Sequence, residues 1–391
     1  MKIKQSPDDF IVEELTDVVP TDGPFALYRL EKSGWTTNDA VISIRRRWRI
    51  DSRRLSYGGL KDRHAHTFQH LTILHGPHRN LAQNGFSLTY LGQTSEPFTP
   101  TSIRANRFRI TIRNLTAKQV ETAGHAVEAV RRDGIANYFD DQRFGSVTAG
   151  SDFVARQLVL GNFEAALKLA LAEPYEHDRS AAKREKAILH EHWGNWKLCK
   201  EKLPRGHAHI LVDYLVSHPA DFRGAFARLR QDLGSLYLSA YQSHLWNRLL
   251  AAWLGQHLSP NERVSLQLKM GSVPTPRGPS AERRAEWALL SLPLPSARLD
   301  YAESIPGTPP DWPIILKVIL DEDQIELGQM KLKGLRRPFF SRGARPILFQ
   351  PEELVMNSGQ DERNAGRQAV QLAFVLPPGS YATLVVKRLF V

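Results

Sequence analysis

One aspartate inside a strongly basic segment is the first residue of this chain that could carry out chemistry. Residues 45–63 contain eight Lys or Arg and only two Asp, and Asp62 lies between Lys61 and Arg63, shortly after a Gly-Gly turn. Neighbouring cations favour the ionised form of a carboxylate, which can then act as a nucleophile or a general base near neutral pH. A charge run is also typical of a solvated helix face, and Lys-Asp-Arg is common on surfaces. The pattern by itself leaves both interpretations open.

A second segment, residues 136–145, combines aromatic, amide and arginine side chains. Aromatic rings such as Phe139 can stack on unpaired bases, amides such as Asn137 can bind base edges, and Arg143 can contact phosphate. The alternative is a loop of the core in which Phe139 and Phe144 only fill space. Residues 239–247 also mix polar and aromatic side chains on a predicted helix, and there we favour a structural role.

A cluster of histidines raises the question of a metal site. A zinc ion needs three or four ligands at about 2 Å, commonly including a carboxylate or a thiolate. His64, His66 and His70 could share one face of a strand, but no cysteine lies nearby. We therefore expect no metal site and favour solvated or RNA-facing histidines. The cluster consists of His64, His66, His70, His75 and His78.

The composition favours a polyanionic partner. The chain has 391 residues, with 52 Lys or Arg against 41 Asp or Glu and a formal net charge of +11. A basic surface that binds phosphates releases condensed counterions, although a generically basic soluble protein would have the same composition. At about 100–200 residues per domain, the length predicts two or three domains.

Several functional classes are excluded by what the sequence lacks. The single cysteine, Cys199, excludes a disulfide framework, a zinc finger and an iron–sulfur site. No P-loop pattern, no G-x-G-x-x-G after a strand and no G-x-S-x-G occurs, so we expect no cofactor. The sequence also shows no secretory signal and no apolar run near the ~20 residues that span a bilayer. We expect a cytoplasmic protein with no membrane segment.

The elements that must position these side chains are mostly strands in the first 115 residues. One helix interrupts them, beginning at an N-cap, Thr36 or Thr37, and a second helix follows them, from Thr116, with Gln119 completing a capping box, to Gly134. An antiparallel sheet flanked by helices fits this alternation, so the predicted fold class is α+β. The strand segments, rich in β-branched and aromatic residues, are 10–15, 26–30, 68–74, 86–91 and 108–112.

The character of the chain changes after residue 150. Residues 152–172 and 237–257 have helical periodicity, and strand character returns at 344–349, 371–376 and 381–390. This order predicts an inserted domain, with the last strands rejoining the first sheet. We place the outer domain at residues 1–150 and 342–391, and the inserted α/β domain at residues 151–341.

Four motifs, in order along the chain, resemble those of the TruD family of RNA pseudouridine synthases. Residues 4–14 resemble the opening K-x-x-P-(D/E)-D-F-x-V-x-E, and residues 59–69 fit G-x-K-D-(K/R)-x-A-x-T-x-Q at every fixed position. Residues 137–145 match N-Y-F-x-x-Q-R-F-G, and residues 378–383 resemble P-x-G-S-(F/Y)-A-T. The resemblance is thinner across residues 151–341, apart from 239–247. Leu60 is bulkier than the small or polar residue often found there.

The resemblance implies a pseudouridine synthase catalytic domain, with a central mixed, mainly antiparallel sheet built from both chain ends, and an inserted TRUD domain. It implies an isomerase that converts uridine to pseudouridine in the D arm of tRNA, at uridine 13, with no metal, nucleotide or redox cofactor. Asp62 would be the catalytic aspartate, which either attacks C1′ or abstracts a ribose proton. Lys4 would pair with Asp62, holding it charged and oriented.

The same resemblance assigns further residues to the substrate. Phe139 would stack on the target uracil, and Phe10, Asn137 and Tyr381 would line the substrate pocket. We expect a monomer that binds tRNA and has no obligate protein partner. The predicted contacts to the RNA backbone come from Arg45, Arg46, Arg47 and Arg63.

Two alternatives are kept open. One is a pseudouridine synthase that acts on other structured RNA. The other is an RNA chaperone without catalytic activity. The joint presence of Lys4, Asp62 and Phe139 speaks against the chaperone, because binding alone needs no carboxylate beside phosphate.

Overall fold

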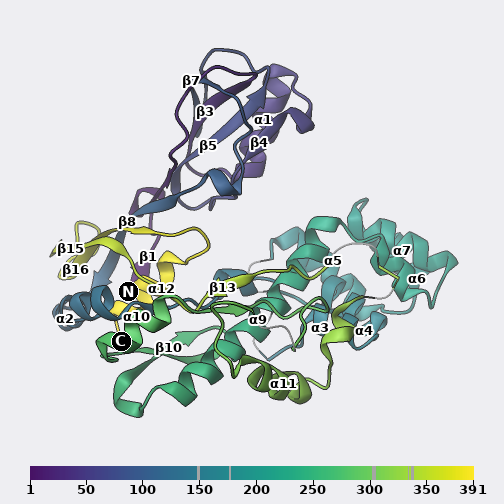
Figure 1. Ribbon diagram of the computed structural model, residues 1–391. Helices are drawn as coiled ribbons and strands as arrows, with labels where there is room; N and C mark the ends of the chain where they lie inside the picture. The colour runs from purple at the N-terminus through teal and green to yellow at the C-terminus, as the bar shows by residue number, and fades with distance from the viewer. Residues whose placement is uncertain (148–149, 176–177, 302–304, 333, 336–338) are drawn as a thin grey trace. The chain divides into compact units, whose positions relative to one another are not determined.

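The computed structural model describes residues 1–147, 150–175, 178–301, 305–332, 334–335 and 339–391 (Figure 1). Contacts divide the chain into two units. Unit 1 comprises Met1–Ile135 and Phe349–Val391, and unit 2 comprises Ala136–Leu348. Both chain ends therefore belong to one unit, and the other is a continuous insertion.

These limits differ from the predicted boundaries at 150/151 and 341/342. The reason is that the segment after residue 135 makes its backbone hydrogen bonds inside unit 2. Ala136 donates its N–H to the Thr275 hydroxyl at 3.1 Å, and Asn137 donates its N–H to the Ile347 carbonyl at 2.9 Å. Residues 136–147 and 342–348 thus belong to the inserted unit.

Unit 1 is built on a ten-stranded sheet with the order β15-β16-β8-β2-β5-β3-β7-β6, in which β1 also pairs with β8 and β4 with β5. All neighbours are antiparallel except β2 and β5, so the predicted mixed, mainly antiparallel sheet from both chain ends is confirmed. The strands are β1 (Lys2–Ile3), β2 (Phe10–Leu15), β3 (Phe25–Lys32), β4 (Leu55–Tyr57), β5 (His66–Leu74), β6 (Leu81–Gln83), β7 (Phe86–Thr94), β8 (Ala105–Leu115), β15 (Glu352–Gln360) and β16 (Gln368–Leu376).

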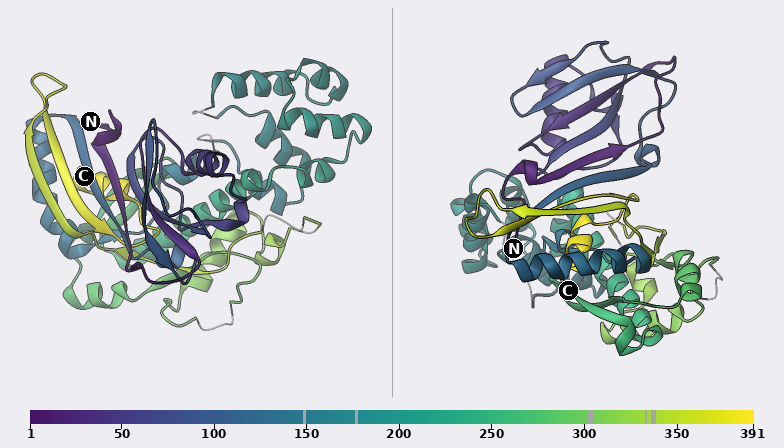
Figure 2. Two further views of the ribbon diagram at one scale, coloured as in Figure 1. Left: turned by 90° about the horizontal axis from the view of Figure 1, so that it is seen from above. Right: turned by 90° about the vertical axis from the view of Figure 1, so that its left-hand side faces the viewer.

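Both helices predicted in the first part of the chain are confirmed. Helix α1 (Thr37–Trp48) begins at the N-cap Thr36, whose hydroxyl accepts the Asp39 N–H. Helix α2 (Ala117–Asp133) has the predicted capping box and ends at Gly134. The apolar face of α1 packs on β3, β5 and β7 (Figure 1), while α2 packs on β15 and β16 (Figure 2). Three short 3₁₀ helices complete this part, at Pro7–Asp9, Ser52–Arg54 and Pro100–Ser102.

The prediction of a strand at residues 381–390 is wrong, because this segment forms helix α12 (Ala382–Leu389). Its β-branched pair, Val385 and Val386, favours a strand locally, and a short apolar run does not distinguish a strand from a buried helix. Packing against α2 decides in favour of the helix, which buries Leu384, Val385 and Leu389. The strand predicted at residues 371–376 is confirmed as part of β16.

In its described residues, unit 2 is mainly helical, with two small antiparallel pairs of strands that lie wholly inside it. Its longest helix, α9, buries Tyr241, Trp246 and Trp253 and contains the helix predicted at 237–257. The helix predicted at 152–172 divides into two at Gly161, whose φ of +82° interrupts it. The helices are α3 (Val154–Val159), α4 (Phe163–Leu171), α5 (Ser180–Glu191), α6 (Trp196–Lys202), α7 (His207–Ser217), α8 (Phe222–Ala227), α9 (Gln231–His257), α10 (Ala281–Ala288) and α11 (Trp312–Glu322).

The strand pairs of unit 2 are β10 (Arg263–Leu268) with β11 (Gly271–Pro276), and β12 (Ser291–Pro293) with β13 (Ala344–Pro346). The strand character predicted at 344–349 therefore belongs partly to a local pair, not to the main sheet. Short strands β9 (Ile135–Ala136) and β14 (Leu348–Phe349) lie where the chain leaves and re-enters unit 1, and 3₁₀ helices occur at Asp141–Phe144, Pro260–Glu262 and Leu327–Met330. Within the described residues, no helix combines the length and the apolar character that crossing a bilayer requires.

Candidate active site

Asp62 lies in the turn between β4 and β5, where its carboxylate has two hydrogen-bond donors. Oδ2 accepts from the ammonium of Lys4, and Oδ1 accepts from the backbone N–H of His64 at 3.0 Å. The side chains of Asp62 and Lys4 are each 23% exposed. Burial raises the pKa of the Asp62 carboxyl, but the hydrogen bonds from Lys4 and His64 outweigh that effect and hold this pKa below its ordinary value. The carboxylate is therefore ionised and within reach of a ligand.

Lys4 reaches Asp62 from an unusual backbone conformation. Its φ is +60°, in the left-handed region that residues other than glycine rarely adopt. On one side, β1 anchors the chain on β8, and on the other the Ser6 N–H donates to Asp9 at 2.9 Å. Arg113 donates to Asp9 at 2.9 Å and to Asp361 at 3.1 Å. The surrounding contacts thus over-determine the turn that presents Lys4.

Phe10 completes this cluster. Its ring is 5% exposed, its centroid lies 4.2 Å from the Lys4 ammonium, and it packs edge-on against Phe108 at 6.2 Å. The structure therefore brings three of the predicted residues together in unit 1: Lys4, Phe10 and Asp62. Tyr381 belongs to the same unit, where it is the partly buried N-cap of α12.

The cations next to Asp62 in the sequence are directed elsewhere, which corrects the expectation that they hold it ionised. The Lys61 ammonium lies 3.1 Å from the buried Glu14 carboxylate and donates to Asn106 at 2.8 Å. Arg63 donates its Nε–H to the Gly34 carbonyl at 3.0 Å. The neighbouring cations therefore bond to other groups, and Lys4, distant in the sequence, pairs with Asp62.

The arginines predicted to bind RNA lie at the end of α1 and beside Asp62. Arg46, Arg47 and Arg63 are exposed, whereas Arg45 is partly buried and donates to the Ile50 carbonyl at 3.4 Å. Arg45, Arg46 and Arg47 occupy the last turn of α1, where cations also stabilise the helix through its dipole. The exposed members are available to a polyanion.

Unit 2 holds a second cluster, centred on Phe139. The ring is 8% exposed, with the Arg345 guanidinium 4.3 Å from its centroid and Trp246 edge-on at 5.5 Å. Asn247 of α9 fixes the backbone of Phe139 from both sides, accepting its N–H and donating to its carbonyl, each at 2.8 Å. The arrangement is a rigid aromatic platform with cationic support.

Asn137 contacts Arg345, the residue that supports this platform. Its side chain donates to the Pro346 carbonyl at 3.0 Å and accepts from Arg345 at 2.6 Å, and the residue is 3% exposed. Arg345 also donates to the backbone carbonyl of Asn137 at 2.7 Å. Asn137 and Arg345 together therefore order the loop that carries Phe139.

The histidine cluster is dispersed over several local contacts. His66 lies 2.8 Å from Glu31 and 3.3 Å from Asp8, the His70 backbone N–H donates to the Glu14 carboxylate at 2.8 Å, and His78 stacks on Tyr90. In the part of the chain that the structure describes, no group of three or more His, Cys, Asp or Glu side chains could hold a metal ion.

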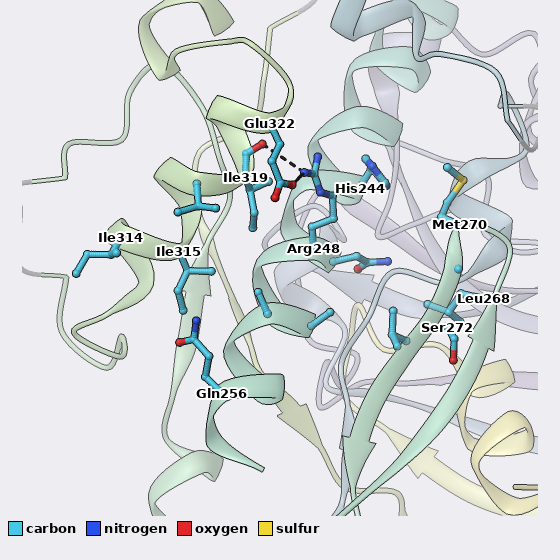
Figure 3. Close-up of a pocket in the computed structure, with 16 residues that line it drawn as sticks. His244, Arg248, Gln256, Leu268, Met270, Ser272, Ile314, Ile315, Ile319 and Glu322 are labelled. Atoms are coloured by element: carbon cyan, nitrogen blue, oxygen red, sulfur yellow. Dashed lines mark hydrogen bonds and ion pairs between the residues drawn. The ribbon is translucent and has the colours of Figure 1, made fainter. Parts of the chain in front are cut away.

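A cavity of about 400 Å³ lies in unit 2 between α9, the β10–β11 hairpin and α11 (Figure 3). Its walls are largely aliphatic, and the Arg248–Glu322 ion pair closes one side. None of the predicted site residues lines it. Asn247 joins its wall to the backbone of Phe139, so the cavity borders the platform without containing it.

The sequence-based interpretation missed three buried charged residues beside these clusters: Glu14, which pairs with Lys61, Lys32, which donates to the Asp62 carbonyl at 2.9 Å, and Arg345. Glu14 ends the buried face of β2 after Phe10 and Val12, and Lys32 ends the buried face of β3. A charged residue continuing an apolar alternation is a signal that could have identified both. Arg345 has no comparable signal, because its partners are distant in the sequence.

Comparisons with known proteins agree with the motifs. The profile of the family described as tRNA pseudouridine synthase D (TruD) matches residues 1–389. The chain is 29% identical to a candidate tRNA pseudouridine synthase D 1 of Methanococcus maripaludis, over all of this chain and 99% of the relative. It is 28% identical to the tRNA pseudouridine synthase D of Leptospira interrogans, over 99% of this chain and 95% of the relative.

The fold is also that of a solved structure. A crystal structure of a candidate tRNA pseudouridine synthase D from Methanosarcina mazei superposes with a TM-score of 0.72 at 25% identity, covering all of this chain and 93% of the other. Because the family profile extends over nearly the whole sequence, with the same fold at this coverage, the chain belongs to the tRNA pseudouridine synthase D (TruD) family and is a pseudouridine synthase, an isomerase.

Proposed function

We propose that this enzyme converts uridine to pseudouridine in the D arm of tRNA, at uridine 13, with Asp62 as the catalytic aspartate. The observation that carries the proposal is the ion pair between Lys4 and Asp62, which keeps a partly exposed carboxylate charged and oriented. A cation beside the carboxylate is useful when the substrate is a polyanion, because it offsets the repulsion between the carboxylate and the RNA phosphates.

The reaction is a rearrangement that conserves atoms. The C1′–N1 glycosidic bond breaks, the uracil rotates, and a C1′–C5 bond forms; C5 loses its proton and N1 gains one. Two first steps for Asp62 fit this balance: attack on C1′, or abstraction of a ribose proton as the glycosidic bond loosens. A primary isotope effect with ribose-deuterated uridine indicates proton abstraction, whereas its absence favours attack on C1′. The rearrangement is redox neutral, so the proposal calls for no cofactor.

The two clusters would serve a base that has left its stack. Unstacking costs a few kcal/mol, which aromatic contacts in the enzyme offset. We assign the exposed part of the Phe139 ring to stacking on the uracil, and Phe10 and Tyr381 to lining the pocket. Asn137, predicted to line the pocket, contributes by ordering the Phe139 loop. Arg46, Arg47 and Arg63 contact phosphates, with a smaller share from Arg45.

Tritium release from RNA labelled at uracil C5 tests the proposal, because forming the C1′–C5 bond expels that hydrogen. The enzymes are the wild type, Asp62→Ala, and the matched control Asp51→Asn, which changes an exposed aspartate in the same basic segment. The substrates are a tRNA transcript, the same transcript with uridine 13 replaced by cytidine, and a structured RNA without a D arm. We expect release only from the first transcript, by the wild type and the control.

The other outcomes discriminate between the alternatives. Release from the cytidine-substituted tRNA or the unrelated RNA keeps the chemistry and rejects the narrow target. Release by Asp62→Ala rejects the catalytic aspartate. Tight binding without release by the wild type favours the RNA chaperone, and RNA remodelling by Asp62→Asn would then confirm that function.

The remaining proposals concern the state of the enzyme in the cell. We propose that it acts on tRNA in the cytoplasm as a monomer. Light scattering of the purified protein with and without a tRNA transcript measures the stoichiometry, for which we expect one chain per tRNA.

A further inference from the structure

A buried lysine lies under the turn that carries Asp62. Lys32 is the last residue of β3 and is 1% exposed. Its ammonium donates to three backbone carbonyls: those of Trp35 at 2.9 Å, Lys61 at 3.3 Å and Asp62 at 2.9 Å. An ammonium has three N–H donors, so each donor has an acceptor. Two of those acceptors belong to the catalytic turn itself.

Burying this lysine is costly for the stability of the fold. Lysine is almost never fully buried unless a carboxylate pairs with it, because removing the charge from water is costly. The partners of Lys32 among the described residues are carbonyl oxygens, and its nearest charges oppose each other. Burial lowers the pKa of Lys32 to about 8, while Asp62 raises this pKa and Lys61 lowers it.

Two uncharged side chains hold the backbone of the residues that precede Asp62. The Thr37 hydroxyl accepts the Lys61 N–H at 2.9 Å, and Gln69 donates to the Gly59 carbonyl at 3.2 Å. These contacts hold the backbone of Gly59 and Lys61, but neither of them involves the Asp62 carbonyl. The hydrogen bond to that carbonyl comes from Lys32, and it orients the peptide from which the carboxylate extends.

We propose that Lys32 is a positioning residue for the reaction: its ammonium clamps the carbonyls of Lys61 and Asp62 and thereby aims the Asp62 carboxylate at Lys4 and the substrate. The proposal rests on the proposed function of Asp62. Lys32 does not touch substrate; it acts through the backbone of the catalytic residue. A purely structural role, anchoring the loop at Trp35, is the alternative that the experiment must exclude.

Lys32→Met tests the clamp because it conserves the shape of the side chain and removes both its charge and its donors. We expect kcat for tritium release to fall about 100-fold with an unchanged KM for tRNA, since misplacing a catalytic group by about 1 Å costs that much. Lys32→Gln restores N–H donors without the charge, and we expect it to recover part of the lost kcat. The matched control is Tyr28→Phe, which removes a buried donor to the Pro77 carbonyl from the same strand.

The pH profile supplies a readout that a structural role would not change. Asp62 and Lys61 are the charged groups that influence Lys32, and its register neighbours, Thr67 on β5 and Phe86 on β7, are uncharged. In the wild type, kcat should fall as the pH rises through about 8, when Lys32 loses its proton. Over the same pH range the free energy of unfolding increases, because the unfolded chain holds the Lys32 proton more strongly than the folded chain does. The loss of activity is therefore not unfolding.

The outcomes separate this inference from the function on which it rests. A wild type that releases no tritium refutes the proposed function. A wild type that is active, with Asp62→Ala inactive and Lys32→Met within about threefold of normal kcat, refutes only the positioning role. An alkaline fall that persists unchanged in Lys32→Met or Lys32→Gln also refutes it. If Lys32→Met does not fold, the same comparisons are made with Lys32→Gln against Tyr28→Phe.

Discussion

The ammonium of Lys4 is hydrogen-bonded to the carboxylate of Asp62, although 58 positions of the chain separate them. A partly buried ion pair of this kind adds little net stability, because desolvation of the two charges offsets their attraction. The backbone conformation that accompanies the pair is unfavourable, because the φ of Lys4 is +60°. We conclude that the pair serves orientation and charge.

Replacing Lys4 tests that conclusion. Lys4→Met removes the strongest hydrogen bond that lowers the pKa of Asp62, so this pKa should rise. The carboxylate is active when ionised, and the acid limb of kcat should therefore move to higher pH. At neutral pH we expect kcat to fall about 100-fold, as when a preorganised donor is removed from an active site. Tritium release between pH 4 and 8 measures both effects.

Lys2→Met is the matched control, because Lys2 is an exposed lysine on β1, two residues before Lys4. It should keep the wild-type kcat and acid limb. An unchanged acid limb in Lys4→Met, with normal folding, would contradict the assigned role.

The parts of this site that the sequence could predict were local. Capping patterns identified both ends of α2 because caps depend on residues within one turn, and alternation located β2 and β5. The partners of Asp62 were different. Adjacent cations were expected to hold it ionised, but Lys61 pairs with Glu14, and only the family motif indicated Lys4. Pairing across a sheet depends on strand order, which local spacing does not contain.

For the Phe139 platform in unit 2, we predict that substitutions of Arg345 and Phe139 have non-additive effects on the free energy of unfolding. Arg345→Met removes the cation over the Phe139 ring and three hydrogen bonds to the preceding loop, and should destabilise the protein by roughly 2–4 kcal/mol. Phe139→Ala should mainly raise KM and lower kcat. Because the two side chains are in contact, the double variant should lose about 1 kcal/mol less stability than the sum.

Chemical denaturation of the two single variants and the double variant measures this coupling. Arg143→Met is the comparison, because its guanidinium lies farther from the ring centroid, at 5.4 Å. Strict additivity for Arg345 and Phe139 would show that the guanidinium supports the loop without acting on the ring.

The basic segment can be tested residue by residue through salt dependence. Each phosphate contact that is lost should reduce the slope of log K against log salt by about 0.9. We expect that reduction for Arg46→Ala and Arg47→Ala, which remove exposed cations. Arg45→Ala should change the slope less, because its Nε–H already serves the Ile50 carbonyl. Filter binding of a tRNA transcript over a range of salt concentrations gives the slopes.

Arg53→Ala is the matched control, since Arg53 is exposed in the same segment but pairs with Asp51 at 3.1 Å. Equal slope changes for all four variants would indicate that the segment acts as a diffuse positive field. No change in any of them would remove this segment from the RNA interface.

The anchor of the Lys4 turn gives a prediction for stability against pH. The Asp361 carboxylate, whose side chain is fully buried, accepts the Asn114 N–H at 2.7 Å, the Arg363 N–H at 3.0 Å and the Arg113 guanidinium at 3.1 Å. Burial raises the pKa of Asp361, but these hydrogen bonds outweigh it and hold this pKa well below its ordinary value of 3.8. A depressed folded-state pKa contributes stability above pH 3.8 that is lost as the pH falls toward the folded value.

Asp361→Asn should therefore lower Tm by a nearly constant amount between pH 5 and 8, and the difference from the wild type should shrink below pH 4, where the wild type loses the same contribution. Thermal unfolding followed by circular dichroism measures this, with the exposed Asp22→Asn as the control. Because Arg113 joins Asp361 to Asp9, the variant should also loosen the turn that follows Lys4 and lower kcat at neutral pH. A loss of stability without any loss of kcat would show that the turn holds Lys4 without this anchor, and the hydrogen bond from Ser6 to Asp9 would then suffice.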